Sequence, residues 1–275
     1  MDSLLDKRVS IKNKRLSSQF MGTNAVDSLR VLSGIQGDAK PLPPTPIYSL
    51  LLKIGPVIFR SIFRIKTIGM ERIPKKGPVI IAGNHLAHVD PILMIVGTRR
   101  TVRFLSKKEH YDQSFTRFVM NTTGQIETDR ESGGKDALIQ ATEVLRTGQA
   151  MGIFPEGTRS RRTEAPFMQK GKTGVARLAV TFPDVPIHPV AILDTHKMLK
   201  PGSKMFRITT PLTMSVGNGI TWREWIHHPN GGGLSESDLQ EIVDSELDNR
   251  NQKMSELFRS FTDQLMCSLS ALGAP

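Results

Sequence analysis

The sequence is poor in cysteine and in aromatic residues. Cys267 is its only cysteine, so an intrachain disulfide and a cysteine-based metal cluster are excluded, and a reducing, cytoplasmic setting is expected. Aromatic residues make up 6% of the chain, and no recognised nucleic-acid-binding motif is present. These shortages argue against a disulfide-stabilised scaffold and against a nucleic-acid-binding module.

The sequence also lacks a hydrophobic run long enough to cross a membrane. Residues 78–98 come closest to the roughly 18 uncharged apolar residues that a span requires, but polar side chains interrupt them at 84, 85, 88 and 90. The first ten residues contain Asp2 and Asp6 and no apolar core, which argues against a secretory signal. Any contact with a membrane is therefore expected to be peripheral.

Basic residues are in excess. Lys plus Arg number 37 against 26 for Asp plus Glu, which gives a formal net charge of +11 and a pI near 9.9. This excess suits three kinds of anionic partner: nucleic acid, an acidic membrane surface or a phosphorylated substrate. Much of it lies in Lys7–Arg15, Arg99–Lys108 and Arg159–Arg162. Charge alone does not choose among these partners.

The N-terminal part of the chain divides into two segments. Residues 1–46 are expected to be a mobile basic arm that ends in a stiff proline-rich linker, Lys40–Pro46. Residues 47–70 carry apolar side chains at helical spacing with basic residues among them. That pattern is typical of amphipathic membrane-interface helices, and equally of a helix packed on the core. Gly55–Pro56 is expected to break or bend this segment.

Short apolar runs alternate with helical patterns in the main domain, residues 71–228, which precedes a C-terminal helical tail at residues 229–275. Strands are predicted at Val79–Ala82, Val102–Ser106, Gln125–Thr128, Ala150–Phe154, Ile187–Ile192 and Phe206–Met214. Helices are predicted at Pro91–Thr98, Ser114–Met120, Lys135–Thr147 and Lys172–Thr181. The alternation predicts an α/β fold, in which a layered, mostly parallel or mixed sheet is flanked by helices.

A polar segment, Asn84–Asp90, follows a predicted strand and precedes a predicted helix. Loops at the carboxyl ends of strands are where α/β folds place active sites. His85 can accept a proton near neutral pH, and Asp90 can orient its ring and stabilise the imidazolium. On one regular helix the two would diverge by about 140°. Their pairing therefore requires His85 in the turn and Asp90 at the start of the helix.

Two other interpretations of this segment stay open. Asp90 followed by Pro91 is also typical of a helix N-cap with proline at the first helical position, a role that is compatible with catalysis. His85 and His88 can together ligate a metal, but the sequence offers no third ligand at a suitable spacing. No metal is therefore expected.

Ile153–Ser160 is the second unusual segment. An apolar strand ends in Pro155 and then presents a carboxylate, a glycine, a hydroxyl and a guanidinium. Gly157 lets the backbone approach a ligand, Thr158 can donate a hydrogen bond, and Arg159 can bind a phosphate through two parallel bonds. The alternative interpretation is a basic turn between two strands.

Together with two further blocks, these segments resemble the 1-acylglycerol-3-phosphate acyltransferase family, the glycerophospholipid acyltransferases. The four blocks stand in the family's order and spacing at Asn84–Asp90, Gly124–Arg130, Phe154–Ser160 and Val185–Val190. The resemblance spans roughly residues 47–215. It departs from the family's pattern at Ala87, where many members carry serine, at Glu127–Thr128, where hydrophobic residues are common, and at His188, which replaces an apolar residue.

The resemblance implies a role for each matching residue. His85 is the general base and Asp90 its partner. The residues that bind the phosphate and glycerol of the acceptor are Arg130, Glu156, Gly157, Thr158 and Arg159. Supporting positions are Asn84, Lys107, Ser160 and Pro186. For Lys107 a solvated surface lysine is the competing interpretation.

The implied reaction is acyl transfer from acyl-CoA or acyl carrier protein to the free hydroxyl of 1-acylglycerol-3-phosphate, which forms phosphatidic acid in phospholipid synthesis. The acyl thioester is a co-substrate, and no cofactor is expected. The expected partners are this donor, a lysophospholipid acceptor and the cytoplasmic face of an anionic membrane, contacted peripherally, with no nucleic acid. The alternatives are an acyltransferase of the same family that acts on glycerol-3-phosphate, another lysophospholipid or a glycolipid, and a non-catalytic peripheral lipid-binding protein.

Overall fold

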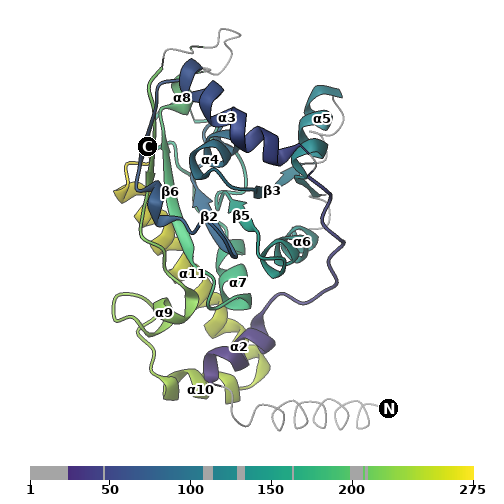
Figure 1. The fold of residues 1–275 in the computed structure, drawn as a ribbon. Helices are drawn as coiled ribbons and strands as arrows, with labels where there is room; N and C mark the ends of the chain where they lie inside the picture. The colour runs from purple at the N-terminus through teal and green to yellow at the C-terminus, as the bar shows by residue number, and fades with distance from the viewer. Residues whose placement is uncertain are drawn as a thin grey trace.

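The computed structural model describes residues 24–45, 47–107, 114–128, 134–162, 164–198, 207 and 210–275. In this part a seven-stranded sheet has the order β1-β7-β6-β2-β5-β3-β4. Figure 1 labels its central strands β6, β2, β5 and β3. The strands are β1 (Ile65–Ile68), β2 (Val79–Gly83), β3 (Val102–Lys107), β4 (Ile126–Thr128), β5 (Ala150–Ile153), β6 (Ile187–Leu193) and β7 (Leu212–Val216). Neighbouring strands are parallel, except that β6 and β7 are antiparallel. The predicted α/β fold is confirmed.

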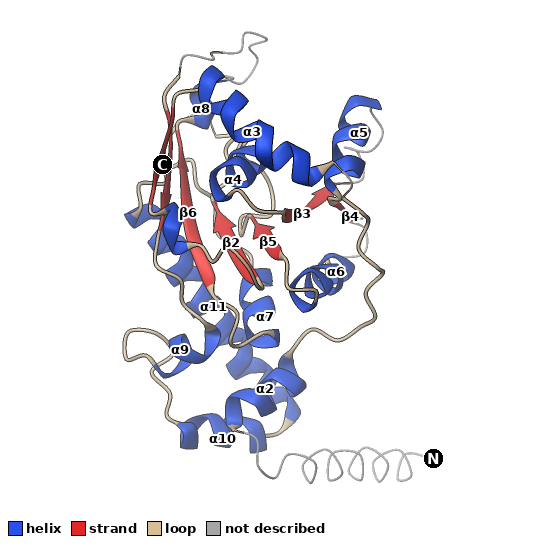
Figure 2. Ribbon diagram, in the orientation of Figure 1, coloured by secondary structure: helices blue, strands red, loops and turns tan. Residues whose placement is uncertain are grey.

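Helices surround the sheet (Figure 2). They are α2 (Ala25–Ser33), α3 (Tyr48–Ile62), α4 (Asp90–Thr98), α5 (Ser114–Thr123), α6 (Lys135–Arg146), α7 (Gly174–Thr181), α8 (Thr195–Met198), α9 (Trp222–His227), α10 (Glu236–Asp244) and α11 (Leu247–Ala271), with a 3-10 turn, η1, at Met70–Arg72. No helix in the described ranges is long and apolar enough to cross a membrane.

The central strand β2 shows how the sheet separates two hydrophobic layers. All five of its residues are buried. Val79 and Ile81 pack in one cluster with Leu93 of α4, whereas Ile80 and Ala82 pack in the other cluster, which includes residues of α2, α6, α7, α9 and α11. A strand covered on both faces reads as a continuous apolar run, because successive side chains point to opposite faces. This is why the central strands were predictable.

The segment 47–70 is only partly helical. α3 ends at Ile62, and residues 65–68 form β1, an edge strand that pairs with β7. The prediction of helix over this second part is wrong, because Ile65 and Ile68 continue the apolar spacing of the preceding helix. Of the predicted break or bend at Gly55–Pro56, the break is wrong. Proline removes one backbone hydrogen bond, but α3 continues through it and packs against α4.

The expected mobile arm is wrong for residues 24–33. Asn24 caps α2 by accepting a hydrogen bond from the backbone of Asp27 at 3.0 Å. Ala25, Val26 and Leu29 of α2 are buried against α7 and α10. The expectation for residues 1–23 lies outside the described residues.

The C-terminal tail is helical, as predicted. α10 begins at a capping box, and α11 packs along α7 and β6, where Phe258, Phe261 and Leu265 are buried. The predicted strand Phe206–Met214 is observed as β7, which begins at Leu212 and ends at Val216. Of its predicted first residues, 206, 208 and 209 lie outside the described ranges.

Candidate active site

The candidate site begins where β2 ends. Asn84 is fully buried, and its amide nitrogen donates to the carbonyl of Ile192 at 2.8 Å while its amide oxygen accepts from the Ile192 N–H at 2.7 Å. The side chain therefore extends the pairing of β2 with β6 by one residue. His85 follows directly and leaves the sheet at its carboxyl edge.

His85 and Asp90 form a hydrogen-bonded pair in the turn between β2 and α4. His85 Nδ1 lies 2.9 Å from Asp90 Oδ2. The same oxygen accepts the backbone N–H groups of Leu86 and Ala87, each at 2.7 Å. The sequence predicted this arrangement, with the histidine in the turn and the aspartate at the helix start.

Asp90 is not the N-cap of α4. The N-cap position is Val89, and Asp90 is the first residue of the helix. Its carboxylate points back along the chain to accept the N–H groups of residues 86 and 87, rather than forward to those of the helix. The capping interpretation is therefore wrong, because the turn before the helix supplies all of these donors.

The imidazole of His85 is fixed from two sides and open on a third. Its ring stacks on Phe154 with centroids 4.1 Å apart, and Phe154 stacks in turn on Phe104 at 5.5 Å. Since Nδ1 is engaged by Asp90, Nε2 is the ring nitrogen left for a substrate. The side chain is 18% exposed, which suffices for that contact. An imidazole held in this way can act as a general base.

Glu156 connects this turn to the loop after β5. It is 2% exposed, and its two carboxylate oxygens accept the backbone N–H groups of His85 and Gln169, each at 2.7 Å. Burial raises the pKa of Glu156, while the two backbone donors oppose that rise. Both oxygens are engaged inside the protein, so Glu156 joins the two loops. The sequence predicted instead that its carboxylate binds the acceptor.

The residues after Glu156 form the exposed part of the loop. Gly157 has a φ of +71°, which favours glycine, and its N–H donates to the carbonyl of Phe154 at 2.9 Å. Thr158 and Arg159 are partly exposed. The N–H of Ser160 donates to the carbonyl of His85 at 2.9 Å, which places this loop beside the backbone of His85.

Lys172 is a cation at this site that the sequence did not single out. Its N–H donates to the carbonyl of Pro155 at 2.7 Å, and its exposed side chain lies beside Gly157, about 3.0 Å from where a Cβ would stand. No local sequence pattern indicated Lys172, because it lies sixteen residues after Glu156. It comes close to Gly157 only because the chain folds back toward the loop.

The other predicted site residues fall in different places. Pro186 is not near the site: its carbonyl accepts from Ile80 near the start of β2, at the opposite edge of the sheet. Lys107 ends β3, and its side chain is not described. Arg130 lies outside the described residues. His188 is buried in β6, and burial lowers its pKa.

Two further features of the described residues bear on ligands. No group of three or more His, Cys, Asp and Glu side chains is arranged to hold a metal ion in this part of the chain.

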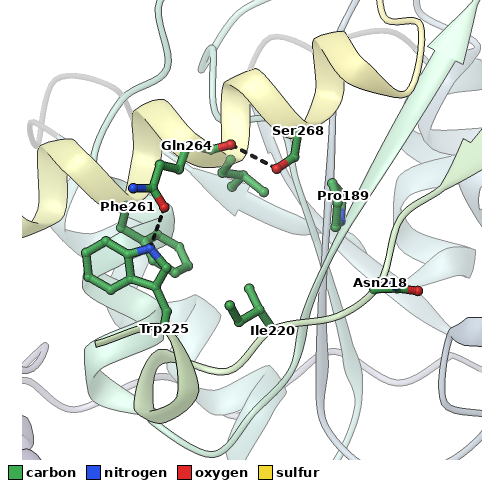
Figure 3. Close-up of a pocket in the computed structure, with 8 residues that line it drawn as sticks. Pro189, Asn218, Ile220, Trp225, Phe261, Gln264 and Ser268 are labelled. Atoms are coloured by element: carbon green, nitrogen blue, oxygen red, sulfur yellow. Dashed lines mark hydrogen bonds between the residues drawn. The ribbon is translucent and has the colours of Figure 1, made fainter. Parts of the chain in front are cut away.

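A pocket between α9, α11 and the segment after β7 is lined by none of the predicted site residues (Figure 3). Three of its polar residues bind one another, since Trp225 Nε1 donates to Gln264 Oε1 at 2.8 Å and Ser268 Oγ to the Gln264 carbonyl at 2.9 Å.

Comparison with known proteins identifies the stretch of chain that contains this site. Residues 64–193, which include β2, β5, β6 and both loops, match the family model described as Acyltransferase. Residues 64–193 are therefore an acyltransferase domain.

Relatives of this acyltransferase domain share one name. A Borreliella burgdorferi protein named 1-acyl-sn-glycerol-3-phosphate acyltransferase is 37% identical over 126 residues, which cover 43% of this chain and 50% of that protein. A Bacillus subtilis protein of the same name is 22% identical over 194 residues, 70% of this chain and 91% of that protein. The chain thus spans about half the length of the first relative and most of the second.

The fold of the acyltransferase domain has a counterpart among solved structures. The 1-acyl-sn-glycerophosphate acyltransferase PlsC from Thermotoga maritima aligns with a TM-score of 0.53 over 80% of both chains, at 20% sequence identity. At this identity the likeness supports the fold.

Proposed function

We propose that this protein transfers an acyl group from acyl-CoA or acyl carrier protein to the free hydroxyl of 1-acylglycerol-3-phosphate, which yields phosphatidic acid. The observation that carries the proposal is the His85–Asp90 pair, held at 2.9 Å beside a loop with exposed cationic side chains. The names of the relatives support the choice of acceptor.

The proposed reaction is direct transfer. His85 Nε2 takes the proton of the acceptor hydroxyl as that oxygen attacks the thioester carbonyl carbon, and Asp90 stabilises the imidazolium. The tetrahedral adduct then collapses, the C–S bond breaks, and the thiolate takes the proton from His85. An ester and a free thiol result. Positioned base catalysis of this kind contributes about 10²–10⁴-fold to the rate.

We assign the acceptor phosphate to the loop after β5. Arg159 offers a planar guanidinium with parallel donors, and Thr158 offers a hydroxyl. Lys172 adds a positive charge beside Gly157. The hydrogen bond from Ser160 to His85 fixes this loop relative to the base. A phosphate bound here would hold the glycerol hydroxyl near Nε2.

We propose that α3 brings the site to a membrane surface. Its apolar residues Leu50, Ile54, Val57 and Ile58 are 47–65% exposed and lie at helical spacing on one face. α3 packs against α4, the helix that begins at Asp90. An exposed apolar stripe on a basic protein is typical of an interfacial helix on an anionic membrane. The cytoplasmic face of such a membrane is the proposed location.

A vesicle experiment tests the role of α3. The double variant Ile54→Asn/Val57→Asn should sediment less with vesicles that contain anionic phospholipid, because it loses exposed apolar surface without touching the core. A matched variant on an exposed face of α11, Asn251→Ser/Gln252→Ser, should sediment like wild type. Equal sedimentation of all three proteins would contradict the membrane role.

The catalytic proposal is tested with purified protein, a panel of lysolipids and both acyl carriers. His85→Ala should lower kcat by about 10²–10⁴-fold, the range for loss of a positioned base. Its circular dichroism spectrum and Tm should stay close to those of wild type. The exposed His228→Ala is the matched control, with kcat expected at the wild-type level. A His85→Ala enzyme with wild-type turnover would refute the assignment.

A further inference from the structure

One oxygen of the Asp90 carboxylate has no partner among the described residues. The side chain is fully buried, and Oδ2 accepts three hydrogen bonds, whereas Oδ1 accepts none from the protein. Leaving a buried acceptor without a donor is unfavourable, because the group has lost its hydrogen bonds to water. Asp90 Oδ1 therefore requires a donor that the His85 turn does not supply.

The strand next to β2 ends in candidate donors. α8 follows β6 directly, and in it His196 Nδ1 and Thr195 Oγ1 are both buried and without a hydrogen-bond partner in the described structure. Asn84 ties the end of β2 to β6, so α4 and α8 both begin at the same edge of the sheet (Figure 2). Three buried polar atoms thus come from the ends of two neighbouring strands.

The charge of Asp90 affects the pKa of His196. Burial lowers the pKa of the His196 imidazole, and Lys197 lowers it further, while the carboxylates of Asp194 and Asp90 raise it. Lys197 and Asp194 pair with each other at 2.6 Å, which leaves Asp90 as the buried charge that acts on this ring from another element.

The loop after β5 holds both histidine rings. His85 stacks on Phe154 at 4.1 Å, and His196 stacks on Phe167 at 4.5 Å with an angle of 27° between the rings. Two residues beyond Phe167, the backbone of Gln169 binds Glu156, which also binds the backbone of His85. One loop therefore contacts both imidazoles, through Phe154 and Phe167.

We propose that His196 is a positioning residue of the catalytic centre, linked through a bridging water molecule to Asp90 Oδ1. No direct hydrogen bond joins the two atoms, and a polar site with three partners suits one buried water. The link holds the carboxylate in the orientation that His85 needs and draws part of its charge away from His85. The kinetic part of this proposal rests on the proposed acyl transfer.

The test compares His196→Phe with His196→Asn. Phenylalanine keeps the stacking on Phe167 and loses the donor, whereas the asparagine amide nitrogen stands where Nδ1 was. His196→Phe should lower kcat about tenfold with an unchanged KM, the size expected when one buried hydrogen bond to a charged group is lost. His196→Asn should retain most of the rate. The matched control is His228→Phe, because His228 is an exposed histidine just after α9.

The pH profile separates positioning from a structural role. Without the His196 donor, Asp90 places more charge on His85, so the acidic limb of kcat should move up by about half a pH unit, a threefold change in the protonation equilibrium. Glu156, which also faces this pair, is unchanged in all variants. A fall in Tm with an unmoved pH profile would overturn the proposal.

A second readout works without substrate. In full-length protein labelled with nitrogen-15 histidine, the titration midpoint of His85 should rise in His196→Phe and stay in His196→Asn. An inactive wild type would refute the acyl-transfer proposal, and this titration would still decide the role of His196. If His196→Phe does not fold, His196→Gln replaces it. The glutamine amide reaches the position of Nε2 and leaves that of Nδ1 empty, so this variant should behave like His196→Phe. Identical midpoints in all folded variants would overturn the link.

Discussion

The turn after β2 and the loop after β5 form the two halves of the candidate site, and they are built differently. In the turn, Asp90 Oδ2 binds only groups within five residues of it along the chain. In the loop, Glu156 binds the backbone of His85, 71 residues earlier, and that of Gln169, 13 residues later. Local contacts shape the pair to which we assign proton transfer, and long-range contacts place it beside the cations. Substitutions in the turn should therefore change kcat, and substitutions of exposed loop residues should change KM.

The largest effect is expected from breaking the turn with Asp90→Asn. The amide cannot accept every donor that now meets Oδ2, and its neutral side chain cannot stabilise the imidazolium of His85. A His–Asp pair in a serine protease loses about 10⁴-fold in kcat on this change, and we expect a loss of at least about 10³-fold here, with KM close to wild type. Asp136→Asn, an exposed change on α6, is the control. A variant that keeps a tenth of the wild-type kcat would show that the turn does not drive the chemistry.

A smaller effect should come from the loop, through Arg159→Ala. Loss of a charge-assisted contact should raise KM for lysophosphatidate about tenfold and leave kcat within about twofold. For an uncharged monoacylglycerol acceptor the KM should not change. Steady-state assays with both acceptors measure the difference, and Lys170→Ala, an exposed lysine of the same loop, controls for loss of general positive charge. Equal effects on the two acceptors would contradict phosphate binding.

The same contrast explains what the sequence could predict. His85 and Asp90 were predictable because their geometry depends on a short turn, whose residues are contiguous. The strands β2 and β5 were predictable because they are buried on both faces. The sequence did not predict β1, because its isoleucines continue the helical spacing of apolar residues in α3. Only the pairing with β7 makes this segment a strand.

The rest of the site depends on contacts between distant parts of the chain. The bracing role of Glu156 depends on Gln169 and on the backbone of His85, so the sequence suggested a surface ligand instead. Lys172 reaches the site only through the return of the loop. α2 carried a readable signal, an asparagine cap followed by Ala25, Val26 and Leu29, but its burial requires α7 and α10, which come much later in the chain.

The smallest effect is expected from Glu156→Gln, at the residue that joins the two regions. Burial raises the pKa of Glu156 above its value in the unfolded chain, so the folded state holds this proton more tightly. The free energy of unfolding must therefore fall as the pH rises from the ordinary glutamate range through the raised pKa. Glutamine cannot ionise, and Glu156→Gln should lack this fall.

Urea unfolding across this pH range measures the difference between the two proteins. At the acidic end Glu156→Gln should be less stable than wild type by about 1 kcal/mol, because its amide nitrogen cannot accept the Gln169 N–H. That deficit should shrink as the pH rises, since only wild type loses stability. Glu164→Gln, an exposed change in the same loop, should follow the wild-type curve. A deficit that grows with pH would mean that the ionised carboxylate is favoured by folding, so that the two backbone donors outweigh burial and the loops are joined by charge.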